Sequence, residues 1–130
     1  MRIFLSIPLL FAIAFSGCTV EDIDVNYAEK VSGTYALASY ENKLGTVDLN
    51  VNDKVIITRI NDNHVKIYVD FYNSTDDIVA EDVLLAQNGA SYNLSQTYQY
   101  SVLNGKVEPK YLSFRLDYDN DNFDLITAVK

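Results

Sequence analysis

Side chains that could do catalytic chemistry are scarce in this sequence. It has one His and one Cys in 130 residues, too few for a multi-histidine metal centre, an internal disulfide or a thiol pair. His64 lies beside a predicted turn, on the polar face of an alternating segment, where we expect a solvated side chain rather than a general base. No Ser lies in a nucleophile elbow, and no Gly-rich run could cradle a phosphate. The sequence therefore predicts a protein that is not an enzyme and carries no cofactor.

The acidic charge balance argues against nucleic acid as a partner. The chain has 18 Asp and Glu against 10 Lys and Arg, a formal net charge of −8. Nucleic-acid binding needs clustered Lys and Arg for phosphate contacts, so it is not expected.

Asp117, Asp119 and Asp121 have the spacing of the first three ligands of an EF-hand loop. However, Asn122 and Ala128 stand where that loop has Gly and Glu, and we predict no metal site.

The tyrosines are the best candidates for ligand binding, because the chain has ten Tyr and no Trp. Three of them are out of phase with the apolar face of their strands, and exposed rings can stack on sugars or anchor a protein. Another three could instead line a cavity. Tyr also favours strands, so all could be structural. The outward candidates are Tyr68, Tyr72 and Tyr111, and the cavity candidates are Tyr92, Tyr98 and Tyr100.

The N-terminal sequence predicts an export signal. Arg2 precedes an apolar run from Ile3 to Phe15, which is shorter than the roughly 20 residues that cross a bilayer and typical of a secretory signal. Phe15-Ser16-Gly17-Cys18 resembles the lipobox of bacterial lipoproteins. The resemblance implies that residues 1–17 are a signal peptide and that lipid on Cys18 anchors the chain in a membrane.

Residues 18–30 are predicted to be the lipidated cysteine and an acidic tether. Thr19 is not the Asp that resembles an inner-membrane retention signal, so we expect an outer-membrane location. Glu21, Asp22 and Asp24 resemble the acidic surface-export signals of Bacteroidetes-type lipoproteins. A charge run can also be only a solvated tether, so the periplasmic and cell-surface faces both stay open.

Alternation with a period of two dominates the rest of the chain and predicts antiparallel strands with one face on a core. In the clearest case Val65, Ile67, Val69 and Phe71 share a face. Asn88-Gly89 and Asn104-Gly105 suggest tight hairpins. Segment 78–87 could be a helix, but a strand joined through Asn88-Gly89 is preferred. The predicted strands are 32–41, 45–51, 54–60, 64–72, 78–87, 90–96, 98–103, 107–118 and 122–129.

About eight short antiparallel strands imply a single all-β domain over residues 31–130, a closed barrel or a β-sandwich. A closed meander is preferred because it leaves no exposed strand edge. Ser32-Gly33-Thr34-Tyr35 is similar to the opening of lipocalin-like and other calycin barrels. That resemblance implies close backbone approach at Gly33 and an aromatic ring, Tyr35, that plugs the closed end of the barrel.

Together these features predict a lipid-anchored outer-membrane lipoprotein whose barrel is a non-catalytic binding module. Calycin-like barrels bind small apolar ligands, but a fold does not fix a ligand, so a small molecule, a glycan and a protein all stay open. The alternative is a protein-interaction or inhibitor lipoprotein in a cell-surface assembly.

Overall fold

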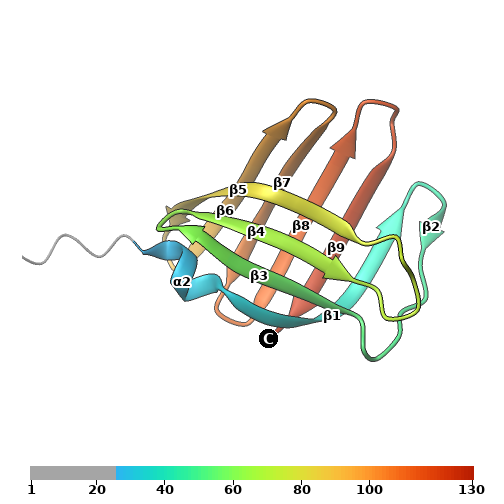
Figure 1. Cartoon of the computed structure of the whole chain (residues 1–130), viewed down its shortest axis with the longest axis horizontal. Helices are drawn as coiled ribbons and strands as arrows, with labels where there is room; N and C mark the ends of the chain where they lie inside the picture. The colour runs from blue at the N-terminus through green and yellow to red at the C-terminus, as the bar shows by residue number, and fades with distance from the viewer. Residues whose placement is uncertain (1–25) are drawn as a thin grey trace, which may run out of the picture.

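The computed structural model describes residues 26–130, which form one short helix and nine strands (Figure 1). The strands are antiparallel to their neighbours, in the order β2-β1-β3-β4-β5-β6-β7-β8-β9. The elements are α2 (Tyr27–Val31), β1 (Gly33–Asn42), β2 (Gly45–Thr46), β3 (Lys54–Asn61), β4 (His64–Asp70), β5 (Ile78–Asn88), β6 (Ser91–Tyr98), β7 (Ser101–Glu108), β8 (Tyr111–Tyr118) and β9 (Phe123–Val129).

Pairing between the first and last strands closes the sheet into a barrel. β1 pairs with β3 over residues 33–36 and with β9 over residues 36–42. Strand β2 only extends a hairpin from the end of β1, where Asn42 faces Gly45. The barrel wall is therefore β1 and β3 to β9. The predicted closed antiparallel barrel is confirmed, and the sandwich alternative is wrong.

Segment 78–87 is a strand, as preferred over a helix. It belongs to β5, which ends at Asn88 and pairs with β6 from Leu84 onward. Gly89, with φ of 63°, begins the connecting turn. An Asn-Gly step is well suited to this turn because Gly takes positive φ without a steric penalty.

The predicted hairpin at Asn104-Gly105 is wrong, because both residues lie inside β7. A Cβ atom at Gly105 would lie 2.4 Å from the carbonyl oxygen of Ser113 and 2.5 Å from the Cβ of Phe114. Gly in a strand often marks such a close approach rather than a turn. The chain turns instead at residues 99–100 and 109–110, so the predicted strands 98–103 and 107–118 are also wrong in their bounds.

The predicted strand 45–51 is mostly a loop. Beyond Thr46 the backbone donates to polar side chains two or three residues away, and such bonds compete with sheet pairing. The backbone N–H of Asn50 donates to Asp53 Oδ2 at 2.7 Å, and the N–H of Asn52 donates to Asn50 Oδ1 at 2.9 Å. The predicted strand 64–72 is also too long, because β4 ends at Asp70.

Helix α2 and Tyr35 close one end of the barrel. Tyr35 is 1% exposed, and its hydroxyl donates to the carbonyl of Val31 at 2.8 Å. Ala28 is fully buried, and its N–H donates to the carbonyl of Asp62 at 2.9 Å. The Tyr35 plug is thus confirmed. The folded domain begins at α2 rather than at residue 31, because this short helix covers apolar core surface.

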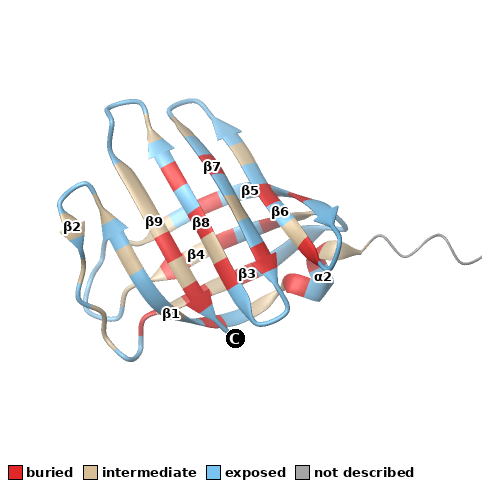
Figure 2. Cartoon of the chain, turned by 180° about the vertical axis from the view of Figure 1, so that it is seen from behind, coloured by how far each residue is buried: buried red, intermediate tan, exposed pale blue. Residues whose placement is uncertain are grey.

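Buried positions concentrate toward the α2 end of the strands, whereas the β6–β7 and β8–β9 turns are exposed (Figure 2). Fully buried side chains from most of the strands meet inside the barrel, among them Val55, Ile67, Leu103, Phe114 and Ile126.

Among residues 26–130, no helix has the length and apolar character needed to cross a membrane. The signal peptide 1–17, Cys18 and the tether up to residue 25 lie outside the described residues, so those predictions are not tested.

Candidate ligand-binding site at the barrel mouth

The two ends of the barrel differ in their chemistry. The α2 end carries helix α2 and the turns at residues 62–63, 89–90 and 109–110. The opposite end, here called the mouth, carries the β1–β2 hairpin, the loop 71–77 and the turns at residues 99–100 and 119–122. Polar side chains and partly exposed aromatic rings gather at the mouth.

A carboxylate held by two phenols lies just inside the mouth. The Tyr40 hydroxyl donates to Asp124 Oδ1 at 2.6 Å, and the Tyr118 hydroxyl donates to Asp124 Oδ2 at 2.7 Å. Burial and the bond to Asp124 raise the pKa of Tyr118 well above its usual value, and the same two causes raise the pKa of Tyr40. Both rings therefore stay protonated donors at neutral pH, and they fix the orientation of the Asp124 carboxylate.

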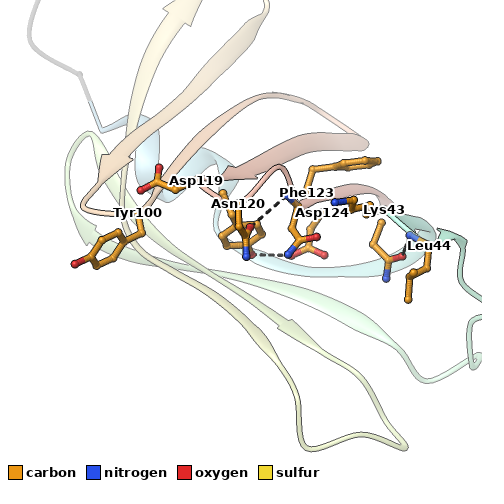
Figure 3. Close-up of a pocket in the computed structure, with 10 residues that line it drawn as sticks. Lys43, Leu44, Tyr100, Asp119, Asn120, Phe123 and Asp124 are labelled. Carbon is orange, nitrogen blue, oxygen red and sulfur yellow. Dashed lines mark hydrogen bonds between the residues drawn. The ribbon is translucent and has the colours of Figure 1, made fainter.

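A cleft of about 620 Å³ opens above this carboxylate. In Figure 3, Tyr100 and Leu44 lie at its opposite ends, with Asn120 and Asp124 between them. The lining residues come from the β1–β2 hairpin, the β6–β7 turn and the β8–β9 connection. They are Asn42, Lys43, Leu44, Tyr100, Tyr118, Asp119, Asn120, Asn122, Phe123 and Asp124.

Backbone hydrogen bonds hold the turns of the mouth together. The N–H of Asp119 donates to the carbonyl of Tyr100 at 3.2 Å, so the β6–β7 and β8–β9 turns are joined. Within the second turn, the N–H of Tyr118 donates to the carbonyl of Asn122 at 2.9 Å, and Asp121 takes a φ of 65°. Asp tolerates this conformation better than most residues. The Asx-rich sequence therefore forms a compact turn that positions the cleft.

Several polar groups in the cleft have no partner within residues 26–130. The Oδ1 of Asn120 accepts from the N–H of Asn122 at 3.3 Å, but its amide NH₂ makes no hydrogen bond there. The same holds for the side chains of Asn122 and Asp119 and for the Lys43 ammonium. The cleft thus offers donors and acceptors together, which suits a polar ligand.

The tyrosines predicted to line one cavity do not meet. Tyr92 lies at the α2 end, where its ring packs 5.2 Å from that of Tyr27. Tyr98 and Tyr100 lie at the mouth and are 68% and 63% exposed. The prediction of a shared cavity is wrong, because the length of strand β6 separates Tyr92 from the other two. Tyr100 lines the mouth cleft, and Tyr98 lines a smaller recess between β5 and β6.

The outward tyrosines do not form one surface either. The Tyr68 hydroxyl donates to Asp77 Oδ2, which raises the Tyr68 pKa and ties the loop 71–77 to β4. Tyr72 is 62% exposed at the mouth, whereas Tyr111 is 41% exposed at the α2 end. Strands β4 and β8 lie on opposite sides of the barrel, so Tyr111 cannot share a face with Tyr68.

The sequence interpretation missed the residues at the centre of the cleft. Tyr118 and Asp124 flank the Asp119–Asn122 connection, which was considered only as a metal site and predicted to be none. A Tyr and an Asp in phase with apolar strand positions were the available signal. Tyr40 faces them only because β1 pairs with β9, and sequence spacing cannot reveal that pairing.

Residues 26–130 contain no group of three or more His, Cys, Asp or Glu that could hold a metal ion. In the EF-hand-like spacing, Asp117 accepts instead from Arg115 Nε at 2.8 Å. The His64 Nδ1 lies 2.9 Å from the side-chain oxygens of Asn61 and Asn63. These contacts stabilise a hairpin turn, and no nucleophile lies among them.

The chain matches no protein-family model and no curated protein. Among solved structures it is similar to a "putative outer membrane protein" of Bacteroides fragilis, with a TM-score of 0.62 and 17% identity over 82% of this chain. This is a likeness of fold. The chain spans 53% of that protein's length. Fatty-acid-binding protein 1 of Echinococcus granulosus has a TM-score of 0.42 and 17% identity over 78% of this chain and 98% of its own.

Proposed function

We propose that this protein is a lipoprotein held in the outer membrane by lipid on Cys18, and that its barrel is a non-catalytic module which binds a ligand at the mouth. The observation that carries the proposal is the mouth cleft, where an oriented carboxylate and unpartnered amides line one open volume and the exposed Tyr100 ring lies at its end (Figure 3). A few convergent polar groups in a concave aromatic site are typical of a binding site.

The geometry also suits display from a membrane. Asn26, the first described residue, lies at the α2 end, and Cys18 is eight positions earlier in the sequence. An extended chain of that length reaches roughly 28 Å at most. An anchor at the α2 end would leave the mouth free to face away from the membrane.

The anchoring half of the proposal is tested by Cys18→Ser. We expect the wild-type chain to incorporate labelled palmitate and to sediment with outer membranes, because two or three acyl chains give stable attachment. The variant should incorporate no label and leave the membrane fraction. A Thr19→Ser variant, which keeps the thiol, is the control. Persistent labelling of Cys18→Ser would disprove anchoring at this residue.

The binding half is tested by ligand-observed NMR with a chemically mixed library of small molecules. Ligands of the mouth should lose their signal changes with Tyr100→Ala and keep them with Tyr111→Ala, since Tyr111 lies at the α2 end. Equal binding by both variants would place the site elsewhere.

A second candidate, docking of a protein at the same end, is favoured by the apolar tips of the mouth loops. Leu44 is 97% exposed in the β1–β2 hairpin, and Tyr72 is 62% exposed in the loop 71–77. Exposed aromatic and aliphatic residues are typical anchors of protein interfaces. This role predicts a partner whose binding is lost with Tyr72→Ser, a change outside the lining of the cleft.

A further inference from the structure

We infer that the ligand of the mouth cleft is an uncharged saccharide. This inference rests on the proposed function, because it names the chemical class of ligand for the same site. Three observations carry it: the apolar surfaces at the two ends of the cleft, the mixture of donors and acceptors between them, and the sign of the charge around them.

The ends of the cleft present apolar surfaces to solvent. The Tyr100 ring is 63% exposed and the Leu44 side chain is 97% exposed, and they lie on either side of the polar centre (Figure 3). A sugar ring has a face of C–H groups and an edge of hydroxyls. Such a face packs on an aromatic ring while the hydroxyls reach the polar groups beside it. An extended chain of sugar units matches the order apolar, polar, apolar.

The polar centre offers what vicinal hydroxyls need. Each hydroxyl both donates and accepts, so its site must supply acceptors and donors at short spacing. Asp124 accepts one phenol on each oxygen, and a carboxylate has about four acceptor positions, so each oxygen can accept once more. The amide NH₂ of Asn120, which has no partner in residues 26–130, supplies a donor beside it.

The charge of the site excludes an anionic ligand. Asp119 and Asp124 line the cleft against one cation, Lys43. A fatty-acid carboxylate or a phosphate would approach Asp124 without a second cation to offset the repulsion. The buried polar and charged residues of the described chain are Asp53 and Ser91, so the interior offers no buried Lys or Arg to pair with an acid. Buried side chains such as Leu103 and Phe114 also occupy the space that an acyl chain would need.

A polyamine is the strongest competing ligand because it would satisfy the carboxylates. It would, however, use only acceptor atoms and would leave the NH₂ groups of Asn120 and Asn122 without a partner. Since amines and saccharides differ in charge, one titration series separates them.

The experiment is calorimetric titration of the full chain, purified in a polyoxyethylene detergent that contains no sugar. The probes are neutral hexasaccharides of glucose, xylose, mannose and N-acetylglucosamine, together with octanoate and spermidine. We expect at least one hexasaccharide to bind, with little dependence on salt because the ligand is uncharged. Neither octanoate nor spermidine should compete with it.

Variants locate the binding. Tyr100→Ala should weaken the saccharide roughly 3- to 10-fold through the lost ring contact, and Asn120→Ala should weaken it by about as much. Tyr111→Ala, which removes an exposed Tyr at the α2 end, should leave the affinity unchanged. A thermal melt of each variant shows whether a loss of affinity reflects unfolding instead.

The outcomes separate the two levels of the proposal. Binding of spermidine or octanoate that Tyr100→Ala weakens would overturn the saccharide class and keep the mouth as the binding site. Saccharide binding that responds equally to Tyr100→Ala and Tyr111→Ala would overturn the site. If no probe binds to a folded chain, the saccharide inference is wrong.

Discussion

The α2 end and the mouth are built from the same strands, but they differ in how their tyrosine hydroxyls are hydrogen bonded. At the α2 end the Tyr35 hydroxyl donates to the Val31 carbonyl, and Tyr35 is 1% exposed. At the mouth the Tyr118 hydroxyl orients a carboxylate that faces a cleft. One tyrosine therefore seals the barrel, and the other helps to shape a polar surface. The same residue type therefore contributes to stability at one end and, under the proposed function, to ligand binding at the other.

Phe114→Ala should give the largest effect, because its side chain is 1% exposed and packs against Gly105 in the sealed part of the barrel. We expect the free energy of unfolding to fall by about 3–5 kcal/mol, measured by urea unfolding. Arg115→Ala, on the outward face of the same strand, is the control and should cost about 1 kcal/mol or less. A loss below about 1 kcal/mol at Phe114 would mean that this region is not packed as described.

Tyr118→Phe tests the polar chemistry of the mouth by its pH dependence. The Tyr118 pKa is raised in the folded chain, whereas the unfolded value is about 10. Above pH 10 the unfolded state therefore binds fewer protons than the folded state, and stability falls as pH rises. We expect wild-type stability to be level between pH 7 and 9 and to fall above pH 10.

The variant should lose part of this alkaline fall and about 1.5–3 kcal/mol of stability at pH 8, the usual worth of a hydrogen bond to a charged group. Tyr111→Phe is the matched control for phenol loss at the other end. An unchanged alkaline profile in Tyr118→Phe would show that burial and the bond to Asp124 do not raise the Tyr118 pKa in the folded chain.

Tyr100→Ala should change stability least and binding most. Because the ring is 63% exposed, we expect the free energy of unfolding to change by no more than about 0.5 kcal/mol. Ligand affinity should still fall, as titration of a bound saccharide would measure. A large drop in melting temperature would instead assign Tyr100 a structural role.

The sequence was sufficient for the fold and insufficient for the site. Alternation of Val65, Ile67 and Val69 identified a strand, and the Gly33–Tyr35 opening placed the plug, because both depend on neighbours in the chain. Gly105 misled the turn prediction because its close approach to Phe114 depends on pairing between strands. The contact of Tyr40 with Asp124 spans most of the domain and requires barrel closure. The alternation of apolar residues within a strand does not predict which strands pair with each other.

The most direct test of saccharide binding at the mouth is an NMR map of backbone amide shifts in the full chain, titrated with the neutral hexasaccharides. If a saccharide binds at the mouth, we expect shifts confined to residues 42–44, 100 and 118–124, with helix α2 and the β7–β8 turn unaffected. Shifts that cluster at the α2 end or in the recess beside Tyr98 would contradict it, as would the absence of any shift across the whole panel.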